Sequence, residues 1–149
     1  MDSSECWICR NAKALTDEHK VKKSDLKRVF GRSGAYPKPL QLRSEDGTQD
    51  VHNDDSDLLK FKTKICGECN NVRTQKHDYA WEALSMAFEN RAPLSPGDTI
   101  NLTEVFPKKT RAQMIRVQLY FVKVLGCAML DEGLMIDLQT FSDAIINQS

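Results

Sequence analysis

The sequence predicts an α+β fold, a single domain whose core is stapled by a metal ion. Two Cys-x2-Cys pairs, Cys6–Cys9 and Cys66–Cys69, supply four sulfur ligands. Short strand-like patterns lie between the two pairs, whereas long apolar patterns with helical spacing follow the second pair. The chain has 149 residues, of which 40% are hydrophobic, so it can form one core that a structural metal would reinforce.

The elements expected before the second cysteine pair are short. Asp46-Gly47 favours a tight hairpin turn, and the alternation of apolar and basic residues around Phe61 indicates a strand with one solvent-exposed face. In chain order we expect a zinc knuckle at Cys6–Cys9, a strand within 14–21, a helical turn at 24–30 with Ser24 as N-cap, breaks at 31–34 and at Pro37 and Pro39, a hairpin turning at Asp46-Gly47, an acidic loop at 52–57 and a strand at 58–65.

Helices are expected to dominate the second half of the chain. After Cys69 a helix should run to about Asn90, because apolar residues such as Trp81 and Phe88 recur on one face. The segment that starts at Thr110 has the form of a capping box and opens a nearly all-apolar helix. The remaining expected elements are a linker at 92–97, a weak strand at 102–106, that apolar helix up to about Leu130 and a final helix at 137–147.

The two cysteine pairs predict a structural zinc site. Two residues separate the sulfurs in each pair, so a tight turn can aim both thiolates at one ion. Four sulfurs close the tetrahedral shell and leave no open position for water or substrate. We therefore expect Cys6, Cys9, Cys66 and Cys69 to hold Zn²⁺ for stability, and the chemistry to lie elsewhere.

Charge is unevenly distributed along the chain. The formal net charge is zero, so the total charge indicates no particular partner. Residues 10–32 contain eight Lys or Arg residues against three acidic residues, whereas residues 44–57 contain six acidic residues and no Lys or Arg. The chain is thus expected to have one basic region and one acidic loop.

The sequence favours a cytoplasmic protein without a membrane span. The first ten residues are polar and include the first cysteine pair, which is unlike a signal peptide. The most apolar stretch, Met114–Leu130, carries Arg116 and Lys123 and is not expected to span a bilayer. Cysteines kept for metal fit a reducing compartment, and Cys127, in an apolar helix, is expected to be a buried, inert thiol.

Three polar residues close to the zinc pairs are candidates for chemistry. Glu18 and His19 lie between the pairs, and Asn70 follows directly on the last cysteine. A carboxylate and an amide oxygen suit a hard cation such as Mg²⁺, and a neutral imidazole can take a proton from water. By contrast, His77 and Asp78 are expected to be first-turn or surface residues of a helix and not ligands, and His52 is expected to be solvated.

These residues resemble the zinc-bearing branch of the HNH endonucleases. The resemblance covers about residues 6–80 and rests on Cys-x2-Cys, then Glu18-His19, then Cys-x2-Cys followed by Asn70. It implies a ββα-metal core in which Glu18 and Asn70 hold a catalytic Mg²⁺ or Mn²⁺ and His19 is the general base. The middle Asn of the family has no clear match, since Asn53 is the only Asn between His19 and Cys66.

The resemblance also implies a substrate and a set of contacts. Such an enzyme hydrolyses DNA phosphodiester bonds with a water that the histidine activates. The residues expected to contact the DNA phosphates are Lys20, Lys22, Lys23, Arg73 and Lys76.

Two parts and two alternative functions follow from the remaining patterns. We expect a zinc-bound, HNH-like core at 1–92 and a helical extension at 93–149 that packs on the core or on a second subunit. A homodimer through the 113–130 helix is one such arrangement. The alternatives to the enzyme are a non-catalytic zinc module that binds nucleic acid or protein, and an interaction protein that works through its helical region.

Overall fold

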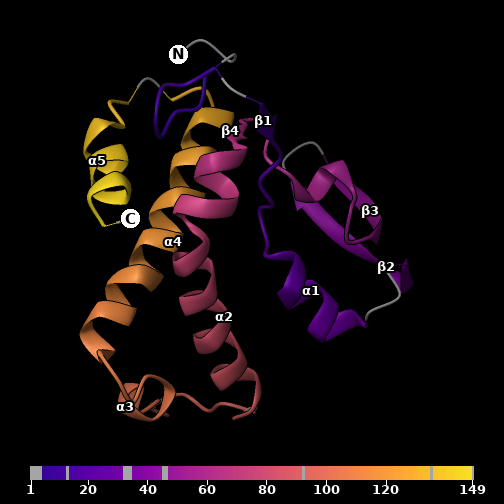
Figure 1. Cartoon of the computed structure of the whole chain (residues 1–149). Coiled ribbons are helices and arrows are strands. Elements are labelled where there is room, and N and C mark those ends of the chain that lie inside the picture. Colours follow the sequence, from indigo (N-terminus) through magenta and orange to yellow (C-terminus); the bar gives the residue numbers. More distant parts are fainter. Residues whose placement is uncertain are drawn as a thin grey trace.

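The computed structural model is a mixed α and β fold, as the sequence predicts, and describes residues 5–12, 14–31, 35–44, 47–91, 93–134 and 136–148 (Figure 1). Two small sheets lie in the first half of the chain, and the longest helices lie in the second half. The elements in chain order are β1 (Leu15–Thr16), α1 (Lys23–Phe30), β2 (Ala35–Ser44), β3 (Gly47–Asn53), the 3-10 helix η1 (Asp57–Leu59), β4 (Ile65–Cys66), the π-helix η2 (Cys69–Arg73), α2 (Gln75–Glu89), α3 (Leu102–Val105), α4 (Thr110–Asp131) and α5 (Gln139–Asn147).

The first sheet joins β1 to β4 in antiparallel register, with Leu15 opposite Cys66. The strand expected within 14–21 is therefore only two residues long, and the chain pairs again at an isolated bridge between His19 and Lys60. The expected strand at 58–65 is wrong for most of its length, because η1 and an irregular segment precede β4. This short sheet places the segment before His19 beside the second cysteine pair.

The second sheet is the β2–β3 hairpin. Ser44 pairs with Gly47, and Asp46 of the predicted turn lies outside the described residues. The break expected at Pro37 and Pro39 is wrong, since both lie within β2. Proline lacks a backbone N–H, which is tolerated at the free edge that each strand of a two-stranded sheet has. The register of the hairpin is also irregular between Ala35 and Leu40, the part of β2 that contains both prolines.

The helix boundaries agree well with the predicted ones, whereas the predicted N-cap residues do not cap their helices. The helices expected after Cys69, from Thr110 and near the C-terminus correspond to η2 with α2, to α4 and to α5. Ser24 is not an N-cap; it lies inside α1 and donates a hydrogen bond to Glu82 over 2.7 Å. Thr110 does not cap α4 either, because its hydroxyl donates to the Phe106 carbonyl over 2.6 Å.

The strand expected at 102–106 is wrong, because this segment forms the short helix α3. Asn101 is its N-cap and accepts a hydrogen bond from the Thr103 N–H over 3.1 Å. The Asn101 amide also donates to Glu104 over 3.0 Å, which ties the first turn together. A local capping arrangement therefore overrides the weak strand pattern.

The main core joins the cysteine knuckle to the C-terminal helices. Trp7 is 1% exposed, packs its ring against Gly126 of α4 and donates from Nε1 to the Cys127 sulfur over 3.4 Å. Cys127 is fully buried, and burial raises the pKa of its thiol to about 12, which confirms the expected inert thiol. The buried residues of this core are Cys6, Trp7, Ile8, Phe61, Ile65, Cys66, Cys69, Leu119, Cys127, Leu138 and Ile145.

The paired helices α2 and α4 run side by side, and α5 lies against α4 (Figure 1). Within this bundle Trp81 stacks on Tyr120 at 5.4 Å and is part-buried as expected, whereas Phe88 is 39% exposed and is not a core residue. His77 lies in the first turn of α2, as expected, but its side chain is completely buried and not on the surface. His52, on β3, is exposed as expected.

Helix α4 is long and apolar enough to cross a membrane by length and composition, contrary to the sequence expectation. The same helix packs against α2 and α5 and contributes Leu119 and Cys127 to the main core. A core helix passes the same test, so its apolar character has an explanation within the fold.

We expect Gly126→Ala to destabilise the protein by about 1–3 kcal/mol, because overpacking a core costs this much. A Cβ at position 126 would lie 2.5 Å from the Trp7 ring, which has no room to move. Urea unfolding followed by tryptophan fluorescence measures the effect. Gln118→Ala, on the exposed side of α4, is the control and should change the stability by less than about 0.5 kcal/mol.

We expect His77 to make the fold sensitive to acid. Burial lowers the pKa of His77 from its ordinary value near 6.5 to about 4, so the folded chain binds its proton more weakly than the unfolded chain. Stability should therefore fall as the pH drops from 6.5 towards 4, by about 1–3 kcal/mol from this residue. Urea unfolding of wild type and His77→Leu across this range isolates the effect, and parallel pH curves for the two proteins would contradict it.

Candidate metal centre and adjoining pocket

The four cysteines of the two pairs form one cluster. Their sulfur atoms all lie within 4.8 Å of one another, and the Cys9 and Cys66 sulfurs are 3.5 Å apart. A tetrahedral zinc ion with Zn–S bonds of about 2.3 Å requires sulfurs roughly 3.8 Å apart. The cluster therefore fits a structural metal such as zinc, with Cys6, Cys9, Cys66 and Cys69 as its ligands.

Backbone contacts shape both knuckles. The Arg10 N–H donates to the Cys6 carbonyl over 2.8 Å, and Arg10 takes a left-handed conformation with φ of 59° that closes this turn. In the second knuckle the Cys69 N–H donates to the Cys66 sulfur over 3.4 Å. The Gly67 N–H donates to the Ala14 carbonyl over 3.1 Å, which extends the pairing of β1 with β4 up to the cluster.

The thiols of the cluster compete for protons. A hydrogen bond from Cys69 lowers the pKa of Cys6 to about 4, and the same contact raises the pKa of Cys69. Burial raises the pKa of Cys66. Without a cation the cluster therefore stabilises one thiolate at the expense of its neighbours, whereas a divalent ion stabilises all four.

A pocket of about 370 Å³ contains the three residues for which the sequence predicts chemistry. Its walls come from the chain after β1, the start of α1, the helices η2 and α2, and α4. The residues that line it are Asp17, Glu18, His19, Lys22, Lys23, Ser24, Asn70, Asn71, Asp78, Glu82, Tyr120 and Lys123. Asn70, which is far from Glu18 and His19 in the sequence, thus lines the same cavity as that pair.

Glu18 and His19 are held by backbone pairing on both sides. The Phe61 N–H donates to the Glu18 carbonyl over 2.9 Å, and the Lys20 N–H donates to the Leu59 carbonyl over 2.7 Å. Together these bonds form the bridge between His19 and Lys60. The backbone of the Glu-His pair therefore has a fixed position in the pocket wall.

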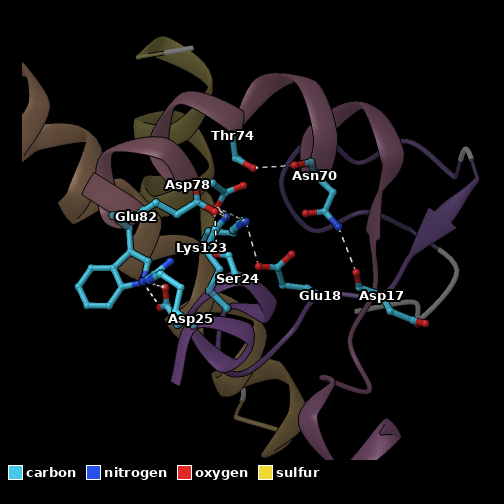
Figure 2. A network of polar contacts seen from close by, with 12 residues as sticks. Asp17, Glu18, Ser24, Asp25, Asn70, Thr74, Asp78, Glu82 and Lys123 are labelled. Carbon is cyan, nitrogen blue, oxygen red and sulfur yellow. Dashed lines mark hydrogen bonds and ion pairs between the residues drawn. The ribbon is translucent and has the colours of Figure 1, made fainter. Parts of the chain in front are cut away.

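The Glu18 side chain is nearly buried and makes an ion pair with Lys123 of α4. The Lys123 ammonium lies 2.9 Å from Glu18 Oε1 and 2.9 Å from Asp78 Oδ1 (Figure 2). Lys22 reaches the same group of acids, at 3.7 Å from Asp78 and 3.5 Å from Glu82. The carboxylates of the pocket are thus partly neutralised by lysines of the chain itself.

The orientation of the Asn70 amide is set by its hydrogen bonds. Its Nδ2 donates to the Asp17 carbonyl and to the Thr16 hydroxyl, each over 3.1 Å. Since a backbone carbonyl can only accept, the nitrogen must face Asp17, and the amide oxygen is turned to the side of Glu18 and Asp78 (Figure 2). Thr74 donates to the Asn70 carbonyl over 3.1 Å and steadies the π-helical turn.

His19 lines the pocket with an unbonded ring nitrogen. Its Nε2 is buried and has no hydrogen-bond partner among the described residues. Asn53 does not contact it by any described hydrogen bond; instead its side chain accepts from the Asp55 N–H over 2.9 Å and forms a local turn. Backbone pairing rather than an asparagine therefore positions His19.

The basic residues expected to contact DNA divide between two surfaces. Lys22 and Lys23 line the pocket, and Lys20 donates to the Leu58 carbonyl over 3.2 Å. Arg73 and Lys76 line a different depression, beside the exposed Tyr79, and do not face Glu18 or His19. The five basic residues therefore do not form the single DNA-contacting surface that was expected.

The acidic loop pairs with the basic segment. Lys23 pairs with Asp55, and Lys27 lies 3.6 Å from Asp54, which is only 3% exposed. These two ion pairs therefore compensate part of the uneven charge distribution along the sequence.

Lys123 and Asp78 are the pocket residues that sequence reasoning misses as functional candidates. Asp78 was expected on the surface of a helix, yet it lines the pocket and pairs with Lys123. A signal for Lys123 was present, because it completes the polar stripe of Gln113, Arg116 and Tyr120 on an otherwise apolar helix. A lysine in that setting needs a buried acidic partner.

Comparisons with known proteins assign no family. No protein-family model matches the chain, and neither the curated proteins nor the solved structures give a match.

We expect the purified protein to hold one zinc ion per chain, and Cys9→Ser or Cys66→Ser to lose most of it, because both sulfurs belong to the cluster. Elemental analysis by mass spectrometry and far-ultraviolet circular dichroism measure metal and fold together. Cys127→Ser is the matched control: it is buried but outside the cluster, and its zinc content should not change. Full zinc retention by both cluster variants would contradict the site.

Proposed function

We propose that this protein is an HNH-type endonuclease that hydrolyses DNA phosphodiester bonds, with the pocket as its active site. The observation that carries the proposal is that Glu18, His19 and Asn70 line one cavity. One of these residues, Asn70, follows directly on Cys69 of the cysteine cluster. These are the residues on which the resemblance to the zinc-bearing HNH enzymes rests.

The order of elements supports a ββα-metal core. β1 pairs with β4 in antiparallel register, and the chain continues from β4 into η2 and α2. Glu18 and His19 follow the first of these strands, and Asn70 lies at the start of the helical part. This arrangement agrees with a motif in which strands present the acid–His pair and the following helix presents the last metal ligand.

Glu18 and Asn70 are the residues that would hold a catalytic Mg²⁺ or Mn²⁺. Their carboxylate and amide oxygens are hard ligands of the kind that these ions prefer. When bound, such an ion would supply positive charge to a phosphodiester whose negative charge increases during hydrolysis. The amide of Asn70 is already oriented by Asp17 and Thr16, so this ligand needs no rearrangement.

His19 is suited to accept a proton from the attacking water. Its Nε2 has no hydrogen-bond partner in the described part of the chain, so no protein group competes for that nitrogen. Because Nε2 is buried, the ring would have to turn for this nitrogen to meet a water in the pocket. The backbone bridge to Lys60 holds the residue in place during the transfer. Lys22 and Lys23 would contact the phosphates on either side of the scissile bond.

The charge of the pocket supports a need for a divalent cation. The lining contains four carboxylates, those of Asp17, Glu18, Asp78 and Glu82, but only three lysines. A DNA phosphate would therefore meet a slightly negative cavity, and an added divalent ion reverses that sign. We infer that DNA cleavage depends on added metal.

A non-catalytic zinc module that binds nucleic acid or protein is the second candidate function. It is favoured by the ion pair between Glu18 and Lys123, which occupies one oxygen of the proposed metal ligand. This reading predicts binding without cleavage under all metal conditions. DNA as partner and the cytoplasm as location remain predictions in either case.

A homodimer through the 113–130 helix also remains a prediction. Phe121 and Leu125 of α4 are 47% and 45% exposed, so this helix keeps an apolar strip that a second copy would cover.

We expect His19→Ala to reduce cleavage of plasmid DNA in Mg²⁺ or Mn²⁺ by about 100-fold or more, because removing a general base has an effect of this size. Agarose gel electrophoresis of supercoiled plasmid follows the reaction, and EDTA should abolish it in the wild type. Zinc content and circular dichroism should remain those of the wild type.

The matched control is His52→Ala, since His52 is exposed on β3 and does not line the pocket. It should cleave at the wild-type rate. Equal cleavage by wild type and His19→Ala would remove His19 from the mechanism, and absence of any metal-dependent cleavage would favour the zinc-module function.

A further inference from the structure

Lys123 is an unusual residue in this fold because it is charged, 1% exposed and located on an apolar helix. Its ammonium lies 2.9 Å from both Glu18 and Asp78. These acids come from the chain after β1 and from α2, so Lys123 joins three separate segments at the pocket wall (Figure 2). It also lies outside residues 6–80, where the resemblance to HNH enzymes ends.

Burying such a group requires specific compensation. An ammonium removed from water costs several kcal/mol unless carboxylates replace its hydration. Tyr120, on which Trp81 stacks, lines the pocket, and Lys123 lies 5.8 Å from the centre of the Tyr120 ring. Glu18 and Asp78 supply the compensating charge, and both keep part of their surface in the pocket, at 11% and 15% exposure.

We propose that Lys123 is a positioning residue that fixes the Glu18 carboxylate in the pocket and competes with a divalent cation for it. The inference rests on the proposed function, and it makes α4 part of the active site. Lys123 already gives Glu18 a cationic partner, so an incoming metal ion meets both an occupied oxygen and a nearby positive charge. The metal site should therefore be weaker than its ligands alone would allow.

The proposal predicts opposite effects on metal binding and on catalysis. Lys123→Met should bind Mn²⁺ about tenfold more tightly or better, because removal of one nearby charge relieves this repulsion. At saturating Mn²⁺ the same variant should cleave plasmid DNA about tenfold more slowly or worse, because a ligand that is no longer held loses its orientation. A residue that only stabilises the fold would not tighten metal binding.

Mn²⁺ titration of the zinc-loaded, full-length protein, followed by electron paramagnetic resonance of the free ion, measures this affinity. Lys123→Arg retains the charge and should bind Mn²⁺ as the wild type does. Lys123→Met combined with Glu18→Gln should lose the gain in affinity, because the gain acts through the Glu18 carboxylate.

The matched control is Arg28→Met. Arg28 also joins two elements through acids, Asp25 at 2.5 Å and Glu89 at 2.9 Å, but it does not line the pocket. Its loss should lower the thermal midpoint without changing Mn²⁺ affinity. This variant separates the loss of an ion pair in general from the loss of the pair at Glu18.

If Lys123→Met fails to fold, the double variant Lys123→Met with Asp78→Asn takes its place in the Mn²⁺ titration, because it removes one charge of each sign. The reference for the double variant is then Asp78→Asn alone. Unchanged Mn²⁺ affinity in a folded, zinc-loaded variant without Lys123 would overturn the proposal. A wild type that never cleaves DNA would overturn the proposed function instead, while the metal titration would still test whether Lys123 opposes a cation at Glu18.

Discussion

The cluster of four sulfurs is the constraint on which the rest of the structure depends. It closes the chain between the first and second knuckles, so that everything between them is a loop with fixed ends. Because β1 starts near one knuckle and β4 runs into the other, the two strands can pair over only two residues and still be stable. That pairing sets where Glu18 and His19 lie relative to Asn70. A metal ion at the cluster would thus define the pocket without taking part in its chemistry.

Ion pairs between segments add to the constraint that the cysteine cluster imposes on the chain. The basic α1 segment and the acidic loop before η1 are joined by the ion pair between Lys23 and Asp55, so part of the uneven charge of the sequence is compensated locally in the fold. The lysines of this segment are therefore partly engaged in structure. A polyanion would find a pocket close to neutrality, and this balance supports the proposed metal dependence.

The sequence predicts the features that depend on local spacing. The cysteine pairs, the β2–β3 hairpin and the helices α2, α4 and α5 follow from residue patterns a few positions long. The burial of His77 and the partners of Lys123 depend on how α2 and α4 pack, which no local pattern encodes. Ser24 fails as a cap because its hydroxyl bonds to Glu82 of α2, a tertiary partner that overrides the local preference. Thr110 fails for a local reason, because its hydroxyl bonds to the Phe106 carbonyl four residues earlier.

Lys123 shows that an unusual residue in a local sequence pattern can indicate a pocket built from segments far apart in the sequence. An isolated lysine in an apolar helix is stable only if a carboxylate is buried with it, so the sequence requires an acidic partner without saying which one. The fold supplies two, and one of them is the carboxylate that the resemblance assigns to the metal. If α4 had served only to bury apolar surface, a leucine at this position would pack with less cost. Under the proposed function, the charge at this position is explained by its contact with Glu18 in the pocket, and that contact would make α4 part of the site as well as of the core.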